Sequence, residues 1–459
     1  MTEGFSRIDQ ELCTGCGSCV STCPAEAITG ERGQPHVISE ERCVGCGRCV
    51  QVCSAYDTLF EEHATPRAKR LELRNLPPGL MEPLFAAYDR CCLPEVREAL
   101  ADPGRVVLAE VGPAVCGAIA EDFGMTPGSV PAGRIVAALK KIGFRKVYDF
   151  TLPSAVAVTE EAHELVNRLE SGGILPVINS SCPAAVKFIE QFHPELIYYL
   201  SSCKSPHMIA GALLKSHAAR AMNLEPAQVY SVSIGPCTSR KFEAGRPEMS
   251  SGGNRHVDAV LTTRELAYMI KEAGIDLQCI AAAPFDPEIP VAPEMENAYC
   301  SPGDISESVL RAGQSLLGNN GDHPLEVKFT VTGTEGVREA VVQLGKHRVQ
   351  AVAVAGLAAA LPFIEAIKTG KNEIAFMELL ACPMGCASGG GQPKVLLPQD
   401  KAATYAVRAG LNSGADAKGE GVPTSSAVRR LYQECFLKPS GDKSNRVVHT
   451  QYEIRKVIQ

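Results

Sequence analysis

Two runs of cysteines with the same spacing constrain the N-terminal part of this chain more than any other feature of its sequence. The first begins at Cys13 and reads CTGCGSCVSTCP, and the second begins at Cys43 and reads CVGCGRCVQVCS. Each run has three cysteines at intervals of three and a fourth cysteine four residues later. Because disulfides do not persist in a reducing compartment, cysteines clustered in this way indicate metal ligands or redox groups.

This spacing is typical of bacterial ferredoxins, in which the fourth cysteine of each run binds the other of two [4Fe–4S] clusters. We therefore expect one cluster at Cys13, Cys16, Cys19 and Cys53, and a second at Cys43, Cys46, Cys49 and Cys23. Zinc is the alternative, but the doubled spacing lacks an accompanying histidine pattern. Residues 1–60 are thus predicted to form a small α+β ferredoxin-like domain.

The overall composition excludes several classes of function. A chain of 459 residues is too long for one core, so two to four domains are expected. The net charge of −7 and the pI near 5.9 argue against nucleic acid as a partner. The start has no basic segment followed by an apolar one, and no apolar run reaches membrane-spanning length. We expect a cytoplasmic protein without a membrane partner.

Residues 61–103 are interpreted as a linker with helices, and the stretch PLFAAYDRCCLPEVREAL is predicted to be helical. Cys91 and Cys92 are adjacent and would point in different directions on a helix, which favours core packing over ligation. The cationic stretch RAKRLELR begins at Arg67 and has two interpretations. It could steer an acidic electron carrier, but a solvated helix face is favoured.

Residues 104–395 alternate between strand-like and helical patterns. The predicted strands are RVVLAEVG, KVYDFT, GILPVINS, QVYSVSIG, DAVLTT, EVKFTVTG, QAVAVAG and IAFMELLA. Helical patterns between them include RIVAALKKIG, EEAHELVNRLE and HMIAGALLKSHAARAM. This alternation predicts parallel sheets that are covered by helices on both faces.

Three of the predicted strands are followed by cysteines. Cys182 follows GILPVINS, Cys237 follows VYSVSIG, and IAFMELLA leads into Cys382 and Cys386. Loops after parallel strands meet at one edge of a sheet, so these four thiolates can hold a third [4Fe–4S] cluster. The glycines at 389–391 would let the main chain approach a bulky inorganic group closely. The alternative is a set of buried free cysteines beside a loop.

The segments SSCPA, GPCTSRKFEA and MELLACPMGCASGGGQP around these cysteines resemble the three signature loops of the [FeFe] hydrogenases. Other segments are similar to that family in the same order, among them AEVGPAV, TEEAHEL, PELIYYLSSCKSP and SAVRRLYQECFLKPSGDKSNRVVHTQY. The resemblance covers nearly the whole chain. It implies the iron hydrogenase fold: an α/β catalytic domain of two lobes at residues 104–395, whose parallel sheets are flanked by helices. Residues 396–459 would be a tail that wraps this domain, similar to a small subunit.

The resemblance also implies a six-iron H-cluster. Its [4Fe–4S] cubane would be held by Cys182, Cys237, Cys382 and Cys386, and Cys386 would bridge to a diiron subsite with carbon monoxide, cyanide and azadithiolate ligands. The pocket around the subsite would include Arg240 as a cyanide hydrogen-bond donor, together with Pro113, Ala114, Ser205, Pro206 and His207. A proton relay would comprise Ser181, Glu161, Ser201 and Glu164. Without the resemblance, those glutamates would be read as a solvated helix face and Ser201 as a turn residue.

Departures from the family place the chain in a divergent branch. Ser181 replaces the cysteine that relays protons, and a hydroxyl is a far weaker acid than a thiol, which titrates near pH 8.5. Arg240 replaces a lysine, and its planar fork differs from an ammonium group. Ala184 and Ala185 replace a Gly-Trp pair, and His207 stands where the family often has glutamine.

The predicted activity is reversible reduction of protons to dihydrogen. Electrons would pass through the N-terminal clusters to or from ferredoxin or another partner subunit, and maturation proteins would supply the diiron subsite. Two alternatives stay open: a hydrogen or redox sensor that turns over slowly, which Ser181 favours, and an iron–sulfur scaffold without the diiron subsite. No G-x-G-x-x-G between a strand and a helix and no Walker loop supports nucleotide binding.

Overall fold

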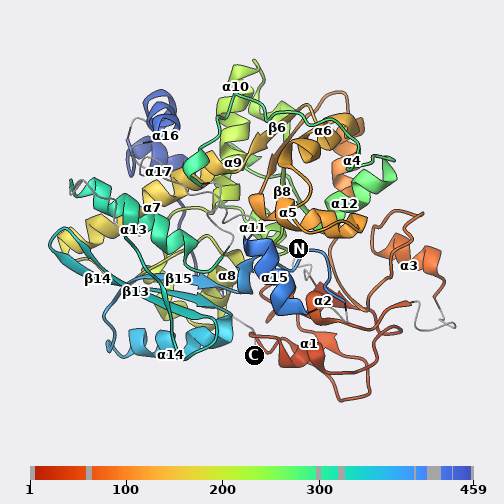
Figure 1. The fold of residues 1–459 in the computed structure, drawn as a ribbon, viewed down its shortest axis with the longest axis horizontal. Helices are drawn as coiled ribbons and strands as arrows, with labels where there is room; N and C mark the ends of the chain where they lie inside the picture. Colours follow the sequence, from red (N-terminus) through yellow and green to blue (C-terminus); the bar gives the residue numbers. More distant parts are fainter. Residues whose placement is uncertain are drawn as a thin grey trace.

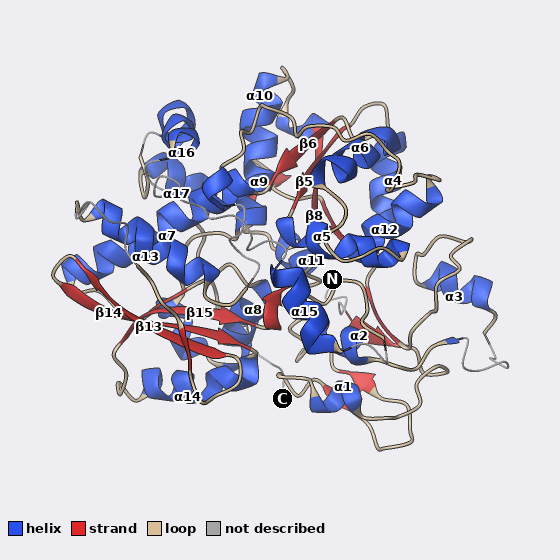
Figure 2. Cartoon of the chain, viewed as in Figure 1, coloured by secondary structure: helices blue, strands red, loops and turns tan. Residues whose placement is uncertain are grey.

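The fold is described from a computed structural model, which covers residues 6–57, 65–295, 301–318, 326–396, 400–410, 425–436 and 438–455. Two lobes, each built on a sheet with helices on its faces, lie side by side, and the N-terminal unit lies against both (Figures 1 and 2). Within the described residues, no helix combines the length and the apolar character needed to span a bilayer.

The N-terminal unit contains short strands and two short helices. Its elements are β1 (Ser6–Ile8), α1 (Ser18–Ser21), β2 (Ile28–Thr29), β3 (Val37–Ile38) and α2 (Arg48–Val52). Helices α1 and α2 each follow a glycine in the left-handed region, Gly17 at φ 80° and Gly47 at φ 69°. A glycine adopts this conformation without the steric cost of a Cβ, which lets each cysteine run turn sharply into its helix.

The segment after this unit is less helical than predicted. Helices α3 (Arg67–Leu73) and α4 (Leu93–Ala101) form, but the stretch between them contains strand β4 (Ala87–Asp89). Strand β4 pairs antiparallel with β1, so the prediction of a helix over PLFAAYDR is wrong. The reason is tertiary, because β1 offers an edge whose hydrogen bonds only a second strand can satisfy.

The cationic stretch at Arg67 has two faces: Lys69 and Glu72 are exposed, in agreement with the expected solvated helix face, whereas Arg70 and Arg74 are buried. Arg70 and Arg74 donate to the same oxygen of Asp9 at 2.6 Å, and Arg67 pairs with Asp57. The side chains of Arg70 and Arg74 are each only 3% exposed. These arginines therefore fasten α3 to the ferredoxin-like unit and are not available to an electron carrier.

The first lobe is built on a sheet whose strands are all parallel, as predicted, and whose order is β11-β8-β5-β6. The strands are β5 (Val106–Val111), β6 (Lys146–Asp149), β8 (Val229–Gly235) and β11 (Ala259–Thr262). One face packs against α4, α6 (Ala132–Ile142) and α12 (Thr263–Glu272). The other packs against α7 (Thr151–Ser171) and α9 (Pro206–Leu213). Shorter elements of this lobe are α5 (Pro113–Ala118), α10 (Ala219–Ala221), α11 (Arg240–Ala244), β9 (Ser250–Ser251) and β10 (Asn254–Arg255).

The second lobe contains a mixed sheet in the order β12-β13-β14-β15-β7. The pairs β14–β15 and β15–β7 are parallel, whereas β12–β13 and β13–β14 are antiparallel. Its strands are β7 (Val177–Ile178), β12 (Thr330–Val331), β13 (Val337–Leu344), β14 (His347–Ala355) and β15 (Ile374–Leu380). Strand β13 was not predicted, so the purely parallel sheet expected here is wrong. A tight turn at Gly345, with φ 55°, joins β13 to β14 as a hairpin, for which parallel pairing is impossible.

Helices cover both faces of this mixed sheet. Helices α8 (Pro183–Phe192) and α14 (Leu357–Lys368) lie on one face, and α7 with α13 (Asp304–Leu316) on the other. Beyond strand β16 (Pro383–Cys386), helix α15 (Lys401–Gly410) lies near α5, and α16 (Ser426–Leu431) and α17 (Asp442–Val448) lie near α7 and α9. Val44 of the N-terminal unit packs in the same core as α8 and β15, which joins that unit to the second lobe.

Candidate functional site

Four cysteines from three distant loops line one cavity between the two lobes. Cys237 follows β8 of the first sheet, Cys182 is the residue before α8, and Cys382 and Cys386 flank and end β16. The space between these side chains, counted together with its opening to solvent, is about 560 Å³. Its wall also includes Ser181, Pro183, Arg240, Ser301, Ile305, Glu378, Leu380, Ala381, Gly385 and Gly389. The sequence analysis correctly expected these cysteine loops to meet.

Burial favours the protonated form of these thiols, so they become thiolates only when a metal replaces their protons. It raises the pKa of Cys182 to about 11 and that of Cys386 to about 12, and it also raises the pKa of Cys382 well above its ordinary value. A thiol with such a pKa stays protonated at neutral pH, whereas a bound cation stabilises the thiolate strongly. The donor set therefore fits a soft, multiply charged metal cluster.

The glycines after Cys386 bring protein segments together. A Cβ on Gly389 would lie 2.4 Å from the Pro236 carbonyl oxygen, and one on Gly390 would lie 2.6 Å from the Cys46 carbonyl oxygen. Gly389 also lines the cavity, so the predicted close approach to a bound group is possible there. Gly389 and Gly390 are needed mainly because the loop packs tightly against the first lobe at Pro236 and against the N-terminal unit at Cys46.

The other eight predicted ligands gather around two further cavities. One is lined by Cys13, Cys16, Cys19 and Cys53, and the other by Cys23, Cys43, Cys46 and Cys49. Each of these spaces, counted together with its opening to solvent, is about 320 Å³. Within the described residues, no three cysteine, histidine or carboxylate side chains converge on a single-ion site; the thiols surround these larger spaces instead. Such a space suits a multi-atom cluster. Cys53 lies with the first three cysteines of the first run and Cys23 with those of the second, as the ferredoxin spacing predicts.

The N-terminal unit is docked directly against the loop that follows Cys386. The Gln51 amide donates to the carbonyl oxygens of Gly389, Gly390 and Gln392 at 3.2, 3.3 and 2.8 Å. From the first lobe, the Thr238 hydroxyl donates to the Gly45 carbonyl at 2.7 Å. These bonds fix the cavity around Cys46 beside the cavity between the lobes.

A hydrogen-bonded network leads away from the cavity at Ser181. The Asn179 amide donates to the Ser181 hydroxyl at 3.2 Å and to both Glu161 carboxylate oxygens at 2.7 Å. Glu161 is 1% exposed, and burial raises its pKa to about 8. Glu161 is therefore a buried acid that titrates near neutral pH, not a solvated helix residue.

Two further residues of the predicted relay form a second, separate pair. The Ser201 hydroxyl donates to Glu164 at 2.8 Å, and Glu164 also pairs with Arg168. Asn179, which connects Ser181 to Glu161, was missed by the sequence analysis. Its place two residues before Ser181, at the end of a strand, was the signal that could have identified it.

Arg240 lies in the wall of the cavity, and space for its side chain depends on a glycine. Its guanidinium lies over the Phe150 ring at 5.2 Å, and Nη1 is buried without a hydrogen-bond partner among the described residues. A Cβ on Gly235 would lie 2.6 Å from that Nη1. A buried, unsatisfied donor at the wall of a cavity fits a bound group that accepts hydrogen bonds.

The other predicted pocket residues lie outside the wall of this cavity. Among the described residues, the buried Ser205 hydroxyl has no partner, whereas His207 Nε2 is hydrogen-bonded to Glu243 at 2.6 Å. Pro113 and Ala114 begin α5, and Pro206 begins α9. The Gln392 amide donates to the Ala114 carbonyl at 2.8 Å and to the Cys386 carbonyl at 3.4 Å, which ties the start of α5 to the cysteine loop.

Glu378 is a second missed residue of the cavity. It is a fully buried carboxyl in strand β15, and burial raises its pKa to about 7. Its oxygens accept from the Ser306 hydroxyl at 2.9 Å and from the Ser306 main-chain N–H at 3.0 Å. A lone charge within the apolar run IAFMELL was the signal for it.

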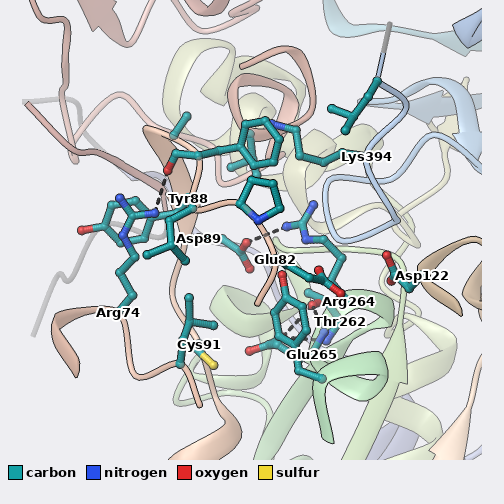
Figure 3. A pocket seen from close by; sticks show the side chains of 18 of the residues that line it. Arg74, Glu82, Tyr88, Asp89, Cys91, Asp122, Thr262, Arg264, Glu265 and Lys394 are labelled. Atoms are coloured by element: carbon teal, nitrogen blue, oxygen red, sulfur yellow. Dashed lines mark hydrogen bonds and ion pairs between the residues drawn. The ribbon is translucent and has the colours of Figure 1, made fainter. Parts of the chain in front are cut away.

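A different cavity, shown in Figure 3, is part of the joint between the linker and the first lobe. Arg264 of α12 donates to Asp89 of β4 at 2.8 Å, and Lys241 donates to the other oxygen of Asp89 at 2.9 Å. Cys91 lies in its wall and is 5% exposed, in agreement with the predicted core role. These ion pairs account for the polar character of the cavity.

Comparison with known proteins identifies the family. The model for the iron-only hydrogenase large subunit, C-terminal domain, matches residues 105–390, and the 4Fe-4S dicluster domain matches residues 6–59. The periplasmic [Fe] hydrogenase large subunit of Nitratidesulfovibrio vulgaris is 38% identical over 392 residues, which cover 85% of this chain and 86% of the relative. The chain therefore belongs to the iron-only, or [FeFe], hydrogenase family. The identity level agrees with the predicted divergent branch.

A solved structure and a second relative are also similar to this chain. A variant of the apo [FeFe]-hydrogenase HydA1 from Chlamydomonas reinhardtii matches with a TM-score of 0.70 and 28% identity, covering 79% of this chain and 99% of that chain. The predicted fold class is thereby confirmed. Protein NAR1 of Arabidopsis thaliana is 29% identical over 380 residues, covering 76% of this chain and 78% of the relative. Because the Nitratidesulfovibrio relative is named periplasmic, a cytoplasmic location stays a prediction.

Proposed function

We propose that this chain is an [FeFe] hydrogenase that interconverts protons and dihydrogen at an H-cluster bound by Cys182, Cys237, Cys382 and Cys386. The observation that carries the proposal is the convergence of these four buried cysteines, from three loops, on one cavity between the lobes. When bound, the H-cluster would supply an iron at which dihydrogen is cleaved heterolytically and a basic amine that exchanges the proton.

The N-terminal unit would carry electrons between a partner and this site. Cys16 is exposed, which supports the cluster of the first cavity as the point of electron entry from ferredoxin or another subunit. The Cys46 main chain, at the second cavity, lies against Gly390 of the loop after Cys386, where a Cβ would be 2.6 Å from the Cys46 carbonyl oxygen. The docking bonds of Gln51 and Thr238 would hold this short electron path rigid.

Protons would be exchanged with the cavity by Ser181 and Glu161, which the Asn179 amide positions by donating hydrogen bonds to both. A carboxyl with a pKa about 8 can both hold and release a proton near neutral pH, which suits Glu161 to this role. The Ser181 hydroxyl is a weak acid, and the Asn179 amide donates hydrogen bonds but does not release a proton at neutral pH. This step is therefore expected to limit the rate, which supports a slow enzyme or a hydrogen sensor.

A second candidate is an iron–sulfur scaffold without the diiron subsite. The observation that favours it is the similarity to Protein NAR1 and to proteins named cytosolic iron–sulfur assembly component 3. Against it stand the four cysteines around one cavity and the unsatisfied donor of Arg240 in its wall.

The test is infrared spectroscopy between roughly 1800 and 2100 wavenumbers on protein matured anaerobically with the hydrogenase maturation proteins, with and without hydrogen. Turnover with methyl viologen is measured on the same material. We expect carbonyl and cyanide bands that shift under hydrogen. Bands with little turnover would identify a sensor, and an absence of bands after a successful maturation of a control hydrogenase would refute the proposal in favour of the scaffold.

A further inference from the structure

An open cleft lies where the N-terminal unit meets α14 and α15. In Figure 1, α15 is the blue helix beside the red helices α1 and α2. The cleft encloses about 950 Å³, and its polar wall comes from Ser18, Ser21, Thr22, Arg48 and Lys401. The first residues of α14, Leu357 and Ala358, complete it.

The charges in this cleft are one-sided. Arg48 Nε and Nη2 donate to the Thr22 hydroxyl at 3.0 and 2.8 Å, and neither Arg48 nor Lys401 forms an ion pair within the part of the chain that the structure describes. Among the described residues, no aspartate or glutamate lines the cleft. Elsewhere in this unit the arginines have acidic partners, as in the pair between Arg42 and Glu26.

We propose that this cleft binds a phosphate group, either as free phosphate or on a phosphorylated small molecule. Two cations from separate elements and the hydroxyl groups of Ser18 and Thr22 line one cleft and can donate to a tetrahedral oxyanion, while the Ser21 hydroxyl already donates to the Ser18 carbonyl at 3.1 Å. The start of α14 adds main-chain N–H groups without intrahelical partners and the positive end of a helix dipole of 12 residues. An oxyanion would accept from the donors that stay free and would balance the two positive charges, which a neutral ligand would not do.

Because of where the cleft lies, an anion bound in it would change the reduction potential of a neighbouring cluster. Cys23 and Arg48 line both this cleft and the cavity around Cys43, Cys46 and Cys49. A dianion in the cleft would therefore lie next to the inner N-terminal cluster. Negative charge disfavours the reduced, more negative cluster, so the anion would lower its reduction potential. This consequence rests on the proposed cluster ligands, whereas binding itself does not.

Binding is measured by calorimetric titration of the anaerobic holoprotein with inorganic phosphate and with pyrophosphate, in chloride buffer at constant ionic strength. We expect saturable binding at one site per chain. Arg48→Gln removes one cation, and Ala358→Glu places a carboxylate in the cleft at an exposed position. Each is expected to weaken binding by about tenfold or more. Arg42→Gln is the matched control, since it removes a paired arginine of the same unit outside the cleft.

The unsubstituted protein binding neither anion, or equal affinity in Ala358→Glu and Arg42→Gln, would overturn the proposal. Iron content is measured in each variant. If it is unchanged, the variant is still folded, and weaker phosphate binding is due to loss of the binding site. Tighter pyrophosphate than phosphate binding would indicate a diphosphate-bearing ligand. A redox titration followed by electron paramagnetic resonance tests the consequence: the midpoint of the inner cluster falls with phosphate only if the two are coupled. Failure of hydrogen turnover would leave the binding result intact, so the two proposals fail separately.

Discussion

Replacing Glu161 by glutamine should stabilise the protein at alkaline pH while it lowers hydrogen turnover. Burial moves the pKa of this carboxyl from 4.5 to about 8, so between these pH values the native state keeps a proton that the unfolded chain loses. The free energy of unfolding of the native sequence therefore falls as pH rises through this window. The full shift corresponds to at most about 5 kcal/mol above pH 8. Glutamine does not titrate and avoids this loss.

The assay is the unfolding temperature of anaerobic holoprotein at pH 5 and at pH 8.5, together with methyl viologen turnover. The difference between variant and native protein should grow with pH, and turnover should fall by roughly 10²-fold because an amide does not relay a proton. Glu170→Gln is the matched control, since Glu170 lies on the same helix but is exposed. If the difference in unfolding temperature between variant and native protein does not change with pH, Glu161 is not a buried acid with a raised pKa. Full turnover in the variant would show that Glu161 does not relay protons.

The remaining predictions concern the cysteine loop and the relay. Cys386→Ala should lose the carbonyl and cyanide bands but keep the N-terminal cluster signals; retained bands would contradict the ligand assignment. Ser181→Cys should raise hydrogen evolution by roughly 10²-fold, and an unchanged rate would locate the slow step elsewhere. Gly390→Ala places a Cβ 2.6 Å from the Cys46 carbonyl and should cost about 1–3 kcal/mol, seen as a lower unfolding temperature. Gly79→Ala, where a Cβ meets nothing within 4 Å, is its control, and equal unfolding temperatures would count against the docking contact.

Several parts of the site were predictable because they depend on local sequence. The cysteine spacing specified which thiols share a cavity, including the exchange of Cys23 and Cys53 between the two runs. The alternation of strands and helices placed Cys182, Cys237 and Cys382 at the ends of strands. Loops after parallel strands meet at one edge, which brings Cys182 and Cys382 together in the second lobe. Cys237 follows a strand of the other sheet, and only the packing of the two lobes brings it to them.

Other parts were not predictable because the partner lies far away in the chain. Strand β4 forms because β1, about eighty residues earlier, offers an open edge. The arginines of α3 look solvent-facing in the sequence, yet Asp9 and Asp57 bury them. Their ion pairs depend on how α3 docks, which no local pattern specifies.

The sequence by itself determined the family, the fold class and the three groups of four cysteines, since spacing and periodicity are properties of the chain alone. Tertiary structure decided how these parts act on one another. It packs Gly390 against the Cys46 carbonyl and connects Ser181 to Glu161 through hydrogen bonds from Asn179. It also places Arg48 and Lys401 in the wall of one cleft, where neither has an acidic partner among the described residues. Hydrogen bonding, burial and charge pairing depend on distances between residues, and only the folded chain fixes those distances.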